Sequence, residues 1–177
     1  MKAVNSRIQW SGRSWRLRVD SLPRPDGSLE EKGYVEHPGA VVLVPLQGDQ
    51  VIMLRQYRAA LGETILELPA GTRGWDEDWL ACAQRELREE TGYRADRFVS
   101  LGQVWPAPGF SSERMAIFLA TGLTPDPLPQ DFDEQITLQT MPLDELVTMA
   151  LDGRLQDAKS IAALLRTAHY QVGQRVG

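Results

Sequence analysis

The stretch GTRGWDEDWLACAQRELREETGY, residues 71–93, contains the sequence pattern that decides the fold of this chain. Its four glutamates stand at spacings typical of one loop followed by one helix: Glu77, Glu86, Glu89 and Glu90. The last three fall on one helical face, where like charges repel each other unless a cation lies among them. A metal site is therefore the first hypothesis, and an ordinary solvated helix face is the alternative.

Packing of the predicted helix favours the metal site over the solvated face. Leu80, Ala83 and Leu87 recur at helical spacing and predict an apolar stripe. This stripe would pack on the core and hold the carboxylate face in place. Gly92 stands where the helix should end.

Length and composition predict one globular domain. A chain of 177 residues with 42% hydrophobic residues is long enough to bury a core without disulfides. The net charge of −5 argues against broad nucleic-acid binding. No apolar run is long enough to span a membrane, and residues 1–10 lack the apolar stretch of a signal peptide. We therefore expect a cytoplasmic enzyme without a membrane partner.

The single cysteine, Cys82, lies inside the predicted helix. It has no partner for a disulfide within the chain, and we interpret it as a small buried hydrophobic residue. The sequence thus predicts neither a disulfide nor a thiolate zinc site.

The N-terminal part of the chain predicts β-hairpins. Residues 8–20 alternate between apolar and charged side chains, which indicates a half-buried strand, and Trp10 belongs to a strand before it. The segment PRPDG at residues 23–27 has the composition of a turn. We assign residues 1–35 to N-terminal strands that belong to the same unit as residues 36–177. The apolar face of the half-buried strand has Trp15, Leu17 and Val19, and its polar face has Arg16 and Arg18.

The remainder of the chain predicts strands and helices in mixed order. The apolar run at residues 41–44 indicates a strand buried on both faces, and residues 51–54 form a second one. This order predicts an α+β or mixed α/β layered fold, because the regular alternation of a doubly wound fold is missing. Further strands are predicted at residues 98–104, 115–120 and 136–141, a loop at 124–129, and helices at 143–151 and 158–172.

Three other segments have residues suited to a ligand. Arg55 and Arg58 follow a buried strand and suit an anionic ligand, although a solvated strand end accounts for them equally well. The acidic residues 131–134, DFDE, are as consistent with an ordinary loop as with a site. The stiff connection at residues 105–113 adds Phe110, Ser111 and Glu113.

These residues resemble the Nudix hydrolase family. Gly71, Glu77 and the run RELREETGY at residues 85–93 match every fixed position of the Nudix box. The likeness covers residues 15–165. Four flanking motifs resemble the ADP-ribose pyrophosphatase branch of the family: VEHPGAV at 35–41, RQYR at 55–58, ELPAG at 67–71 and PGFSSER at 108–114.

The resemblance implies an α/β fold of the Nudix type. This is an α/β/α sandwich with a mixed sheet, in which the box forms a loop, a helix and a second loop, preceded by N-terminal β-hairpin strands. It also implies a homodimer, in which those strands help to complete the partner's site, and hydrolysis of ADP-ribose to AMP and ribose 5-phosphate. Electrostatics agree with this activity, because carboxylates approach a pyrophosphate only through divalent cations. Oxygen ligands favour Mg²⁺, with Mn²⁺ as a further possibility.

The resemblance also implies roles for single residues. Metal ligands are implied at Glu86 and Glu90, completed by Glu89 and the main-chain carbonyl of Ala70. The catalytic residues implied are Glu134 as the base that deprotonates water, together with Glu89 and Arg85. Arg85 would hold the glutamates in position, and Glu77 would order the loop.

The implied substrate-binding residues lie in the flanking motifs. They are Arg55 and Arg58 for phosphate, Glu113 for the terminal ribose, Glu67 in a substrate or supporting role, and Pro108 and Phe110. His37 in VEHPG is interpreted as a structural residue.

The chain departs from the branch near Lys32. Some members have an arginine a few residues before VEH that stacks on adenine, whereas residues 30–34 read EEKGY here. Lysine can replace the charge but not the planar stacking surface. GDP-mannose or another nucleoside diphosphate sugar is therefore the alternative substrate. A non-catalytic Nudix-like nucleotide-binding module is the alternative of another class, and it would be expected to lack box carboxylates, all of which this chain retains.

Overall fold

The central sheet is built on two adjoining strands with apolar runs at residues 41–44 and 51–54. The computed structural model of the chain describes residues 2–129 and 135–176. In it Val41, Val42, Leu43 and Val44 are each 0% exposed, so this strand is buried on both faces as predicted. The strands and helices are β1 (Asn5–Ser11), β2 (Arg16–Pro23), β3 (Leu29–Glu36), β4 (Ala40–Gln47), β5 (Gln50–Arg58), β6 (Glu63–Glu67), β7 (Ala70–Thr72), α1 (Trp79–Thr91), β8 (Tyr93–Val104), β9 (Met115–Pro125), β10 (Ile136–Pro142), α2 (Leu143–Asp152) and α3 (Ala158–Val176).

The central sheet has seven strands and is mixed. Its main path runs β10-β5-β4-β9-β8, while β6 pairs with β5 and β7 pairs with β4. The β4–β9 pair is parallel and the other pairs are antiparallel. The parallel pair requires a crossover, and the chain makes it through α1, which places this helix beside the sheet.

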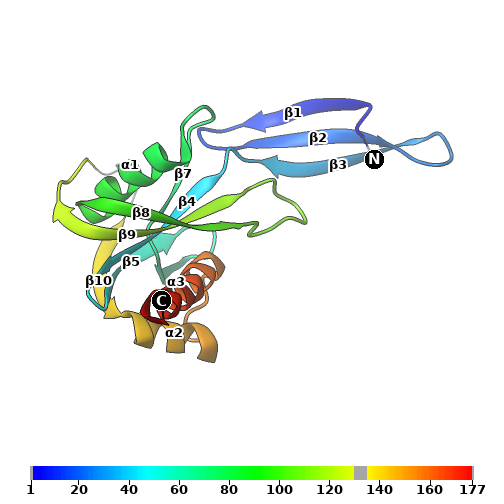
Figure 1. Ribbon diagram of the computed structural model, residues 1–177. Coiled ribbons are helices and arrows are strands. Elements are labelled where there is room, and N and C mark those ends of the chain that lie inside the picture. Colours follow the sequence, from blue (N-terminus) through cyan, green and yellow to red (C-terminus); the bar gives the residue numbers. More distant parts are fainter. Residues whose placement is uncertain (1, 130–134, 177) are drawn as a thin grey trace.

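Helices cover both faces of this sheet (Figure 1). On one face α1 packs through Ala83 and Leu87 on a cluster that contains Val41 and Leu43. On the other face α2 and α3 pack on a second cluster, formed with Val42, Val44, Met53, Leu146 and Leu164. The predicted α/β/α sandwich is therefore confirmed.

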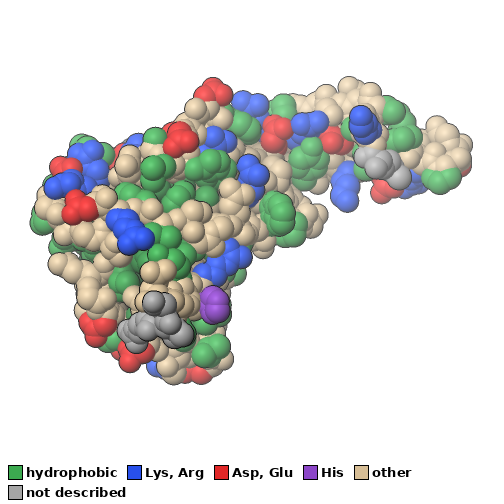
Figure 2. Space-filling view, in the orientation of Figure 1, with side chains coloured by type: hydrophobic (Ala, Val, Ile, Leu, Met, Phe, Trp, Pro, Cys, Tyr) green, Lys and Arg blue, Asp and Glu red, His purple; other side chains and the backbone are tan. Residues whose placement is uncertain are grey.

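Strands β1, β2 and β3 form a separate antiparallel sheet, which we call the arm. It extends away from the body, and charged side chains of both signs are interspersed along it (Figures 1 and 2). Every residue of β1 is exposed, and residues 16–20 of β2 are all half-buried. The prediction that Trp10 lies in a strand before the half-buried one is confirmed, but the predicted alternation of burial was wrong. Leu17 and Val19 are only half-buried, like Arg16 and Arg18, because no second layer from residues 2–129 or 135–176 covers either face of the arm.

The apolar stripe predicted for α1 was wrong at one position. Leu80 is 41% exposed, whereas Cys82, Ala83 and Leu87 are fully buried. Asp78 caps the helix by accepting hydrogen bonds from the backbone N–H groups of Leu80 and Ala81, and this start turns Leu80 outward. Cys82 is the buried residue that the sequence predicted, and burial raises the pKa of its thiol.

One smaller difference lies outside α1. Strand β9 continues to Pro125, so the predicted loop at residues 124–129 starts later than expected. Within the described ranges, no helix is long and apolar enough to cross a membrane.

Candidate active site

Gly71 lets the helix carboxylates reach the backbone of the preceding loop. An ideal Cβ at this position would lie 1.8 Å from the Cδ atom of Glu86, closer than any real contact. Glu90 lies on the same side and accepts a 2.8 Å hydrogen bond from the Ala70 N–H. Strand β7 and helix α1 therefore bring a short piece of main chain and two carboxylates together, with Glu86 7% and Glu90 2% exposed.

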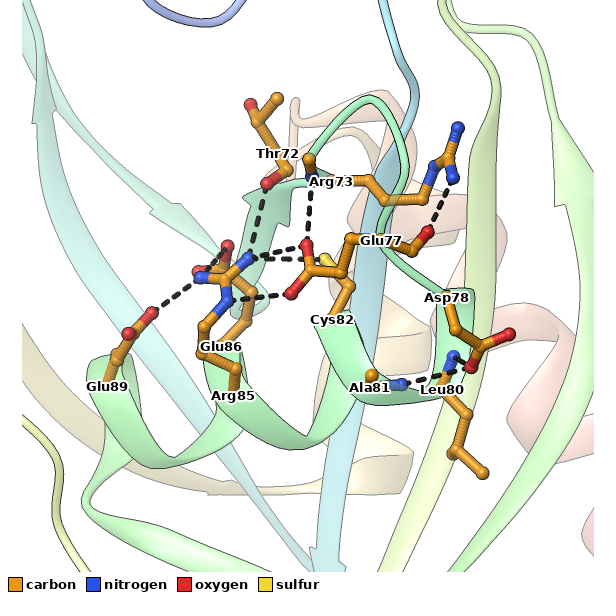
Figure 3. A network of polar contacts seen from close by, with 11 residues as sticks. Thr72, Arg73, Glu77, Asp78, Leu80, Ala81, Cys82, Arg85, Glu86 and Glu89 are labelled. Atoms are coloured by element: carbon orange, nitrogen blue, oxygen red, sulfur yellow. Dashed lines mark hydrogen bonds and ion pairs between the residues drawn. The ribbon is translucent and has the colours of Figure 1, made fainter.

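Arg85 lies among three of the four box glutamates (Figure 3). Its Nε and Nη2 atoms donate to Glu77 over 2.9 and 3.0 Å, and its Nη1 donates to Glu86 and Glu89 over 2.7 Å each. One cation thus offsets the repulsion among these carboxylates. The hydrogen bonds with Glu77 are the largest cause of the raised pKa of Arg85.

Glu77 orders the loop that precedes the helix (Figure 3). Its Oε2 accepts a hydrogen bond of 2.9 Å from the Gly74 N–H while both of its oxygens bind Arg85. The Arg85 hydrogen bond lowers the pKa of Glu77 to about 2. Glu77 therefore stays ionised throughout the pH range in which cells work.

The oxygen donors at this point fit a hard divalent cation. Glu86, Glu89 and Glu90 share one helical face, and the Ala70–Gly71 backbone lies against two of them. In residues 2–129 and 135–176, no three acidic, histidine or cysteine side chains converge tightly enough to hold a cation by themselves. A cation here would share Glu86 and Glu89 with Arg85, with main-chain oxygen as an additional donor.

Arg58 lies beside this cluster and is held by a buried carboxylate. Its Nε and Nη2 atoms each donate to Glu67 over 2.8 Å in a fork geometry. Glu67 is 0% exposed and also accepts a hydrogen bond from Lys159. Burial alone would lower the pKa of Arg58, but the hydrogen bonds and charge of Glu67, with a contribution from Glu90, raise it.

Arg55 is placed elsewhere. Residues three apart on a strand face opposite sides, so Arg55 points away from the side of β5 that Arg58 occupies. Its Nε donates to Gln139 of β10 over 2.8 Å, and the side chain is exposed. The structure thus brings Arg58, but not Arg55, next to Glu90 and Glu67. The phosphate-binding role of Arg55 stays a prediction.

The connection between β8 and β9 is fastened to the end of β3. The Val35 N–H donates to Phe110 O over 2.8 Å, and the Ser112 N–H donates back to Val35 O over 2.9 Å. Phe110 is 64% exposed and Pro108 is also exposed, so both are open to a ligand or to another chain.

Glu113 in the same connection lies near a histidine. Its Oε1 is 3.8 Å from Nε2 of His37, whose Nδ1 accepts a hydrogen bond from the Gly39 N–H. Burial raises the pKa of Glu113 despite the opposing charge of Lys159, and burial lowers the pKa of His37. Lys159 therefore interacts electrostatically with Glu113 as well as with Glu67, the partner of Arg58.

Several polar residues at this site were missed by sequence analysis. Lys159, Asp157 and Ser160 lie at the start of α3, about 90 positions from Glu67, and no periodic pattern relates them. Gln56 is only 5% exposed, and its Oε1 has no hydrogen-bond partner within the described part of the chain. The only available signal was that Lys159 is one of three lysines in an arginine-rich chain. Glu134, predicted as the base, lies outside the described residues.

Comparisons with known proteins show the family of this chain. Residues 36–164 match the family model described as NUDIX domain. The chain is 32% identical to an ADP-ribose pyrophosphatase of Bacillus subtilis (strain 168) over 166 residues, which cover 92% of this chain and 90% of that protein. It is 33% identical, with the same coverage, to a methanol dehydrogenase activator of Bacillus methanolicus. A crystal structure of an ADP compounds hydrolase matches with a TM-score of 0.83 and 25% identity, covering 98% of this chain and 95% of that one.

Proposed function

The chain belongs to the Nudix family of hydrolases, and from this premise we propose that it cleaves the pyrophosphate of ADP-ribose. Water adds to one phosphorus, the bridging P–O bond breaks, and the products are AMP and ribose 5-phosphate. Support comes from the ADP-ribose pyrophosphatase that aligns over nine-tenths of both chains and from the ADP compounds hydrolase with the same fold. The proposed activity rests on the residues of the site, because the same fold occurs in proteins with many different reactions.

The observation that carries the proposal is the meeting of Glu86 and Glu90 with the Ala70–Gly71 backbone. A pyrophosphate repels carboxylates, so buried carboxylates at its binding site require a cation between the two. We propose Mg²⁺, with Mn²⁺ as a substitute, held by Glu86, Glu90, Glu89 and the Ala70 carbonyl oxygen. When bound, this cation would neutralise phosphate oxygens and acidify a water molecule.

The protein's own groups would orient the substrate around that centre. Glu67 fixes Arg58 through two of its nitrogens, which leaves Nη1 to donate to a phosphate oxygen. Glu113 would accept a hydrogen bond from the terminal ribose, and exposed Phe110 and Pro108 would border the sugar or base. Arg85 would keep Glu86 and Glu89 from swinging away. For the base, Glu134 stays a prediction.

The test is an assay of purified protein with ADP-ribose and Mg²⁺, with products identified after reaction in ¹⁸O water. We expect AMP and ribose 5-phosphate, and the label shows which phosphorus is attacked. Glu145→Gln, at an exposed position of α2, serves as a control for carboxylate removal outside the site. Cleavage of another sugar nucleotide without cleavage of ADP-ribose would exclude this substrate.

The second candidate substrate is GDP-mannose or another nucleoside diphosphate sugar. Lys32 is exposed on β3 and offers a charge but no planar surface for adenine. A panel of nucleoside diphosphate sugars in the same assay separates the two candidates by their kcat/KM values. A non-catalytic binding module would show nucleotide binding without release of any product.

We also propose that the protein is a homodimer assembled through the arm. Three strands without a buried face are marginal by themselves in water, and the arm exposes Val4, Ile8, Trp10 and Leu29. Sedimentation analysis should give twice the mass of 19.8 kDa. The cytoplasmic location expected from the sequence stays a prediction.

A further inference from the structure

The start of helix α3 contributes three polar residues to a buried network, Lys159, Asp157 and Ser160, and the proposed reaction gives none of them a role. Glu67, which is fully buried, accepts hydrogen bonds from two cations, Arg58 on β5 and Lys159 on α3. The side chain of Lys159 is only 9% exposed. A lysine is rarely buried unless it is paired, so its place in this network points to a specific role.

The network continues from Lys159 back to the loop of the active site. Lys159 donates to Asp157 over 2.9 Å, and Asp157 accepts hydrogen bonds from both the N–H and the hydroxyl of Ser160. The Ser160 Oγ in turn accepts a 2.7 Å hydrogen bond from the N–H of Leu68. Leu68 follows Glu67 directly and stands two residues before Ala70, so the network closes on the segment that meets Glu90.

The network determines how the guanidinium of Arg58 is oriented. Glu67 holds Nε and Nη2 of Arg58 in a fork, which fixes the plane of the guanidinium. Without Lys159, the Oε2 atom of Glu67 would lose one of its two charged partners in a buried site, and the Glu67 carboxylate and the Arg58 guanidinium would be free to shift together. The orientation of Arg58 would then be lost, even though Arg58 itself is unchanged.

We propose that Lys159 is a positioning residue for the substrate: it locks the Glu67 carboxylate so that Arg58 presents its remaining N–H donors to the pyrophosphate. This inference rests on the proposed function, because it assigns Arg58 to phosphate. The competing hypothesis is that Lys159 only fastens α3 to the sheet. That hypothesis predicts a loss of stability with no particular effect on substrate affinity.

A double-mutant cycle separates the two hypotheses. Lys159→Met is expected to raise KM about tenfold and to change kcat less than about threefold, because it acts on substrate binding. Arg58→Ala should raise KM further, and adding Lys159→Met to it should have no additional effect, since the group being positioned is gone. Additive effects on KM in the cycle would overturn the proposal.

A matched control uses Arg166 of the same helix. It ties α3 to β8 by donating to Leu101 O over 3.0 Å, and it lies outside the network. Arg166→Met should lower the melting temperature while leaving KM within about twofold of the wild type. An equal rise in KM for both variants would mean that any loosening of α3 produces the effect, and would overturn the proposal. If Lys159→Met does not fold, Lys159→Gln, which keeps one N–H donor group, replaces it in the cycle.

A spectroscopic measurement keeps this test independent of turnover. The Nε–H of Arg58 donates to Glu67, so its proton signal in ¹⁵N-labelled protein should be shifted downfield and protected from exchange. In Lys159→Met we expect that protection to fall at least about tenfold, whereas Arg166→Met should leave it unchanged. Unaltered protection in Lys159→Met would contradict the inference. If the wild type cleaves no ADP-ribose, the proposed function fails, and the signal of Arg58 still reports on the network.

Discussion

The Nudix box and the arm are neighbouring regions that differ in how far their side chains find partners within the chain. In the box, Glu77, Glu86, Glu89 and Glu90 all find partners within the chain, through Arg85 and backbone N–H groups. In the arm, every residue of β1 is exposed, and the ring of Trp10 lies against that of Trp15 with the centroids 4.5 Å apart. The box is thus complete in one chain, whereas the arm presents surface that a second chain can bury.

A cation–π contact links these regions. The guanidinium of Arg16 on β2 lies 4.2 Å from the ring centroid of Trp75 in the box loop. Arg18 on the same strand donates to Glu36 of β3 over 2.9 Å, and this hydrogen bond lies within the arm. If the contrast between box and arm is correct, substitutions in the box should lower the rate of turnover with little effect on dimer formation. Substitutions in the arm should weaken dimer formation with little effect on turnover.

The largest effect is expected from Glu90→Gln. This substitution removes one charged ligand from the proposed cation site and should lower kcat by roughly a thousandfold. Glutamine keeps the shape and can still accept from the Ala70 N–H, so circular dichroism and the sedimentation coefficient should not change. Initial rates with ADP-ribose measure the effect, and unchanged turnover would refute the ligand role of Glu90.

Gly71→Ala should have the next largest effect. The added methyl group would collide with the Glu86 carboxylate, so that side chain or the loop must move by about an ångström or more. A displacement of this size should lower kcat/KM about a hundredfold. Gly33→Ala in the arm is the matched control, because its Cβ would meet only ordinary contacts at 4.0 Å. Equal activity of the two variants would contradict the requirement for a close approach at Gly71.

Trp10→Glu tests the arm. In the single chain this side chain is 49% exposed, so the monomer should lose little stability. In a dimer that buries it, a charge should weaken association at least about tenfold without lowering the kcat of molecules that remain dimeric. Analytical ultracentrifugation over a dilution series measures the dissociation constant. Leu151→Glu, at a residue of α2 that is 72% exposed, is the control, and an equal shift there would remove the assignment to the arm.

The smallest effect concerns Glu77 and pH. Its folded-state pKa is lowered to about 2 from 4.5, first by the Arg85 hydrogen bond, so the pair stabilises the fold above pH 4.5. That stabilisation is lost as the pH falls from 4.5 through about 2. Since the pair is partly open to solvent, Glu77→Gln should cost about 1 kcal/mol or less at pH 7. Melting curves of both proteins should converge over this interval, and a difference that stays constant with pH would exclude the Arg85 pair as its source.

The sequence was most informative where local pattern and local structure coincide. Residues 41–44 could be recognised as a fully buried strand because the apolar run is short, rich in β-branched valine and closely followed by a turn. The spacing of the box likewise placed Glu86, Glu89 and Glu90 on one side of α1. Both features depend on neighbours within a single element.

Where partners are distant in sequence, the pattern failed. Helical periodicity favoured Leu80 as a core residue, yet buried Glu86 and Glu90 share the inner face of α1, because loop backbone and Arg85 satisfy them there. Strand alternation at residues 8–20 predicted one buried face, but burial also requires a covering layer, which the described part of the chain does not supply. The link between Glu67 and Lys159 joins residues 92 positions apart, and only the folded sheet brings them together.

Because of Arg85, the helix that contains the box glutamates can form without a bound cation. A newly made chain must bring several carboxylates onto one helix face. The guanidinium of Arg85 is protonated at every pH in a cell and offsets the repulsion among them. The helix can therefore form in a metal-poor environment and persist after chelation. In the proposed site, a divalent cation would therefore bind to a helix that has already formed.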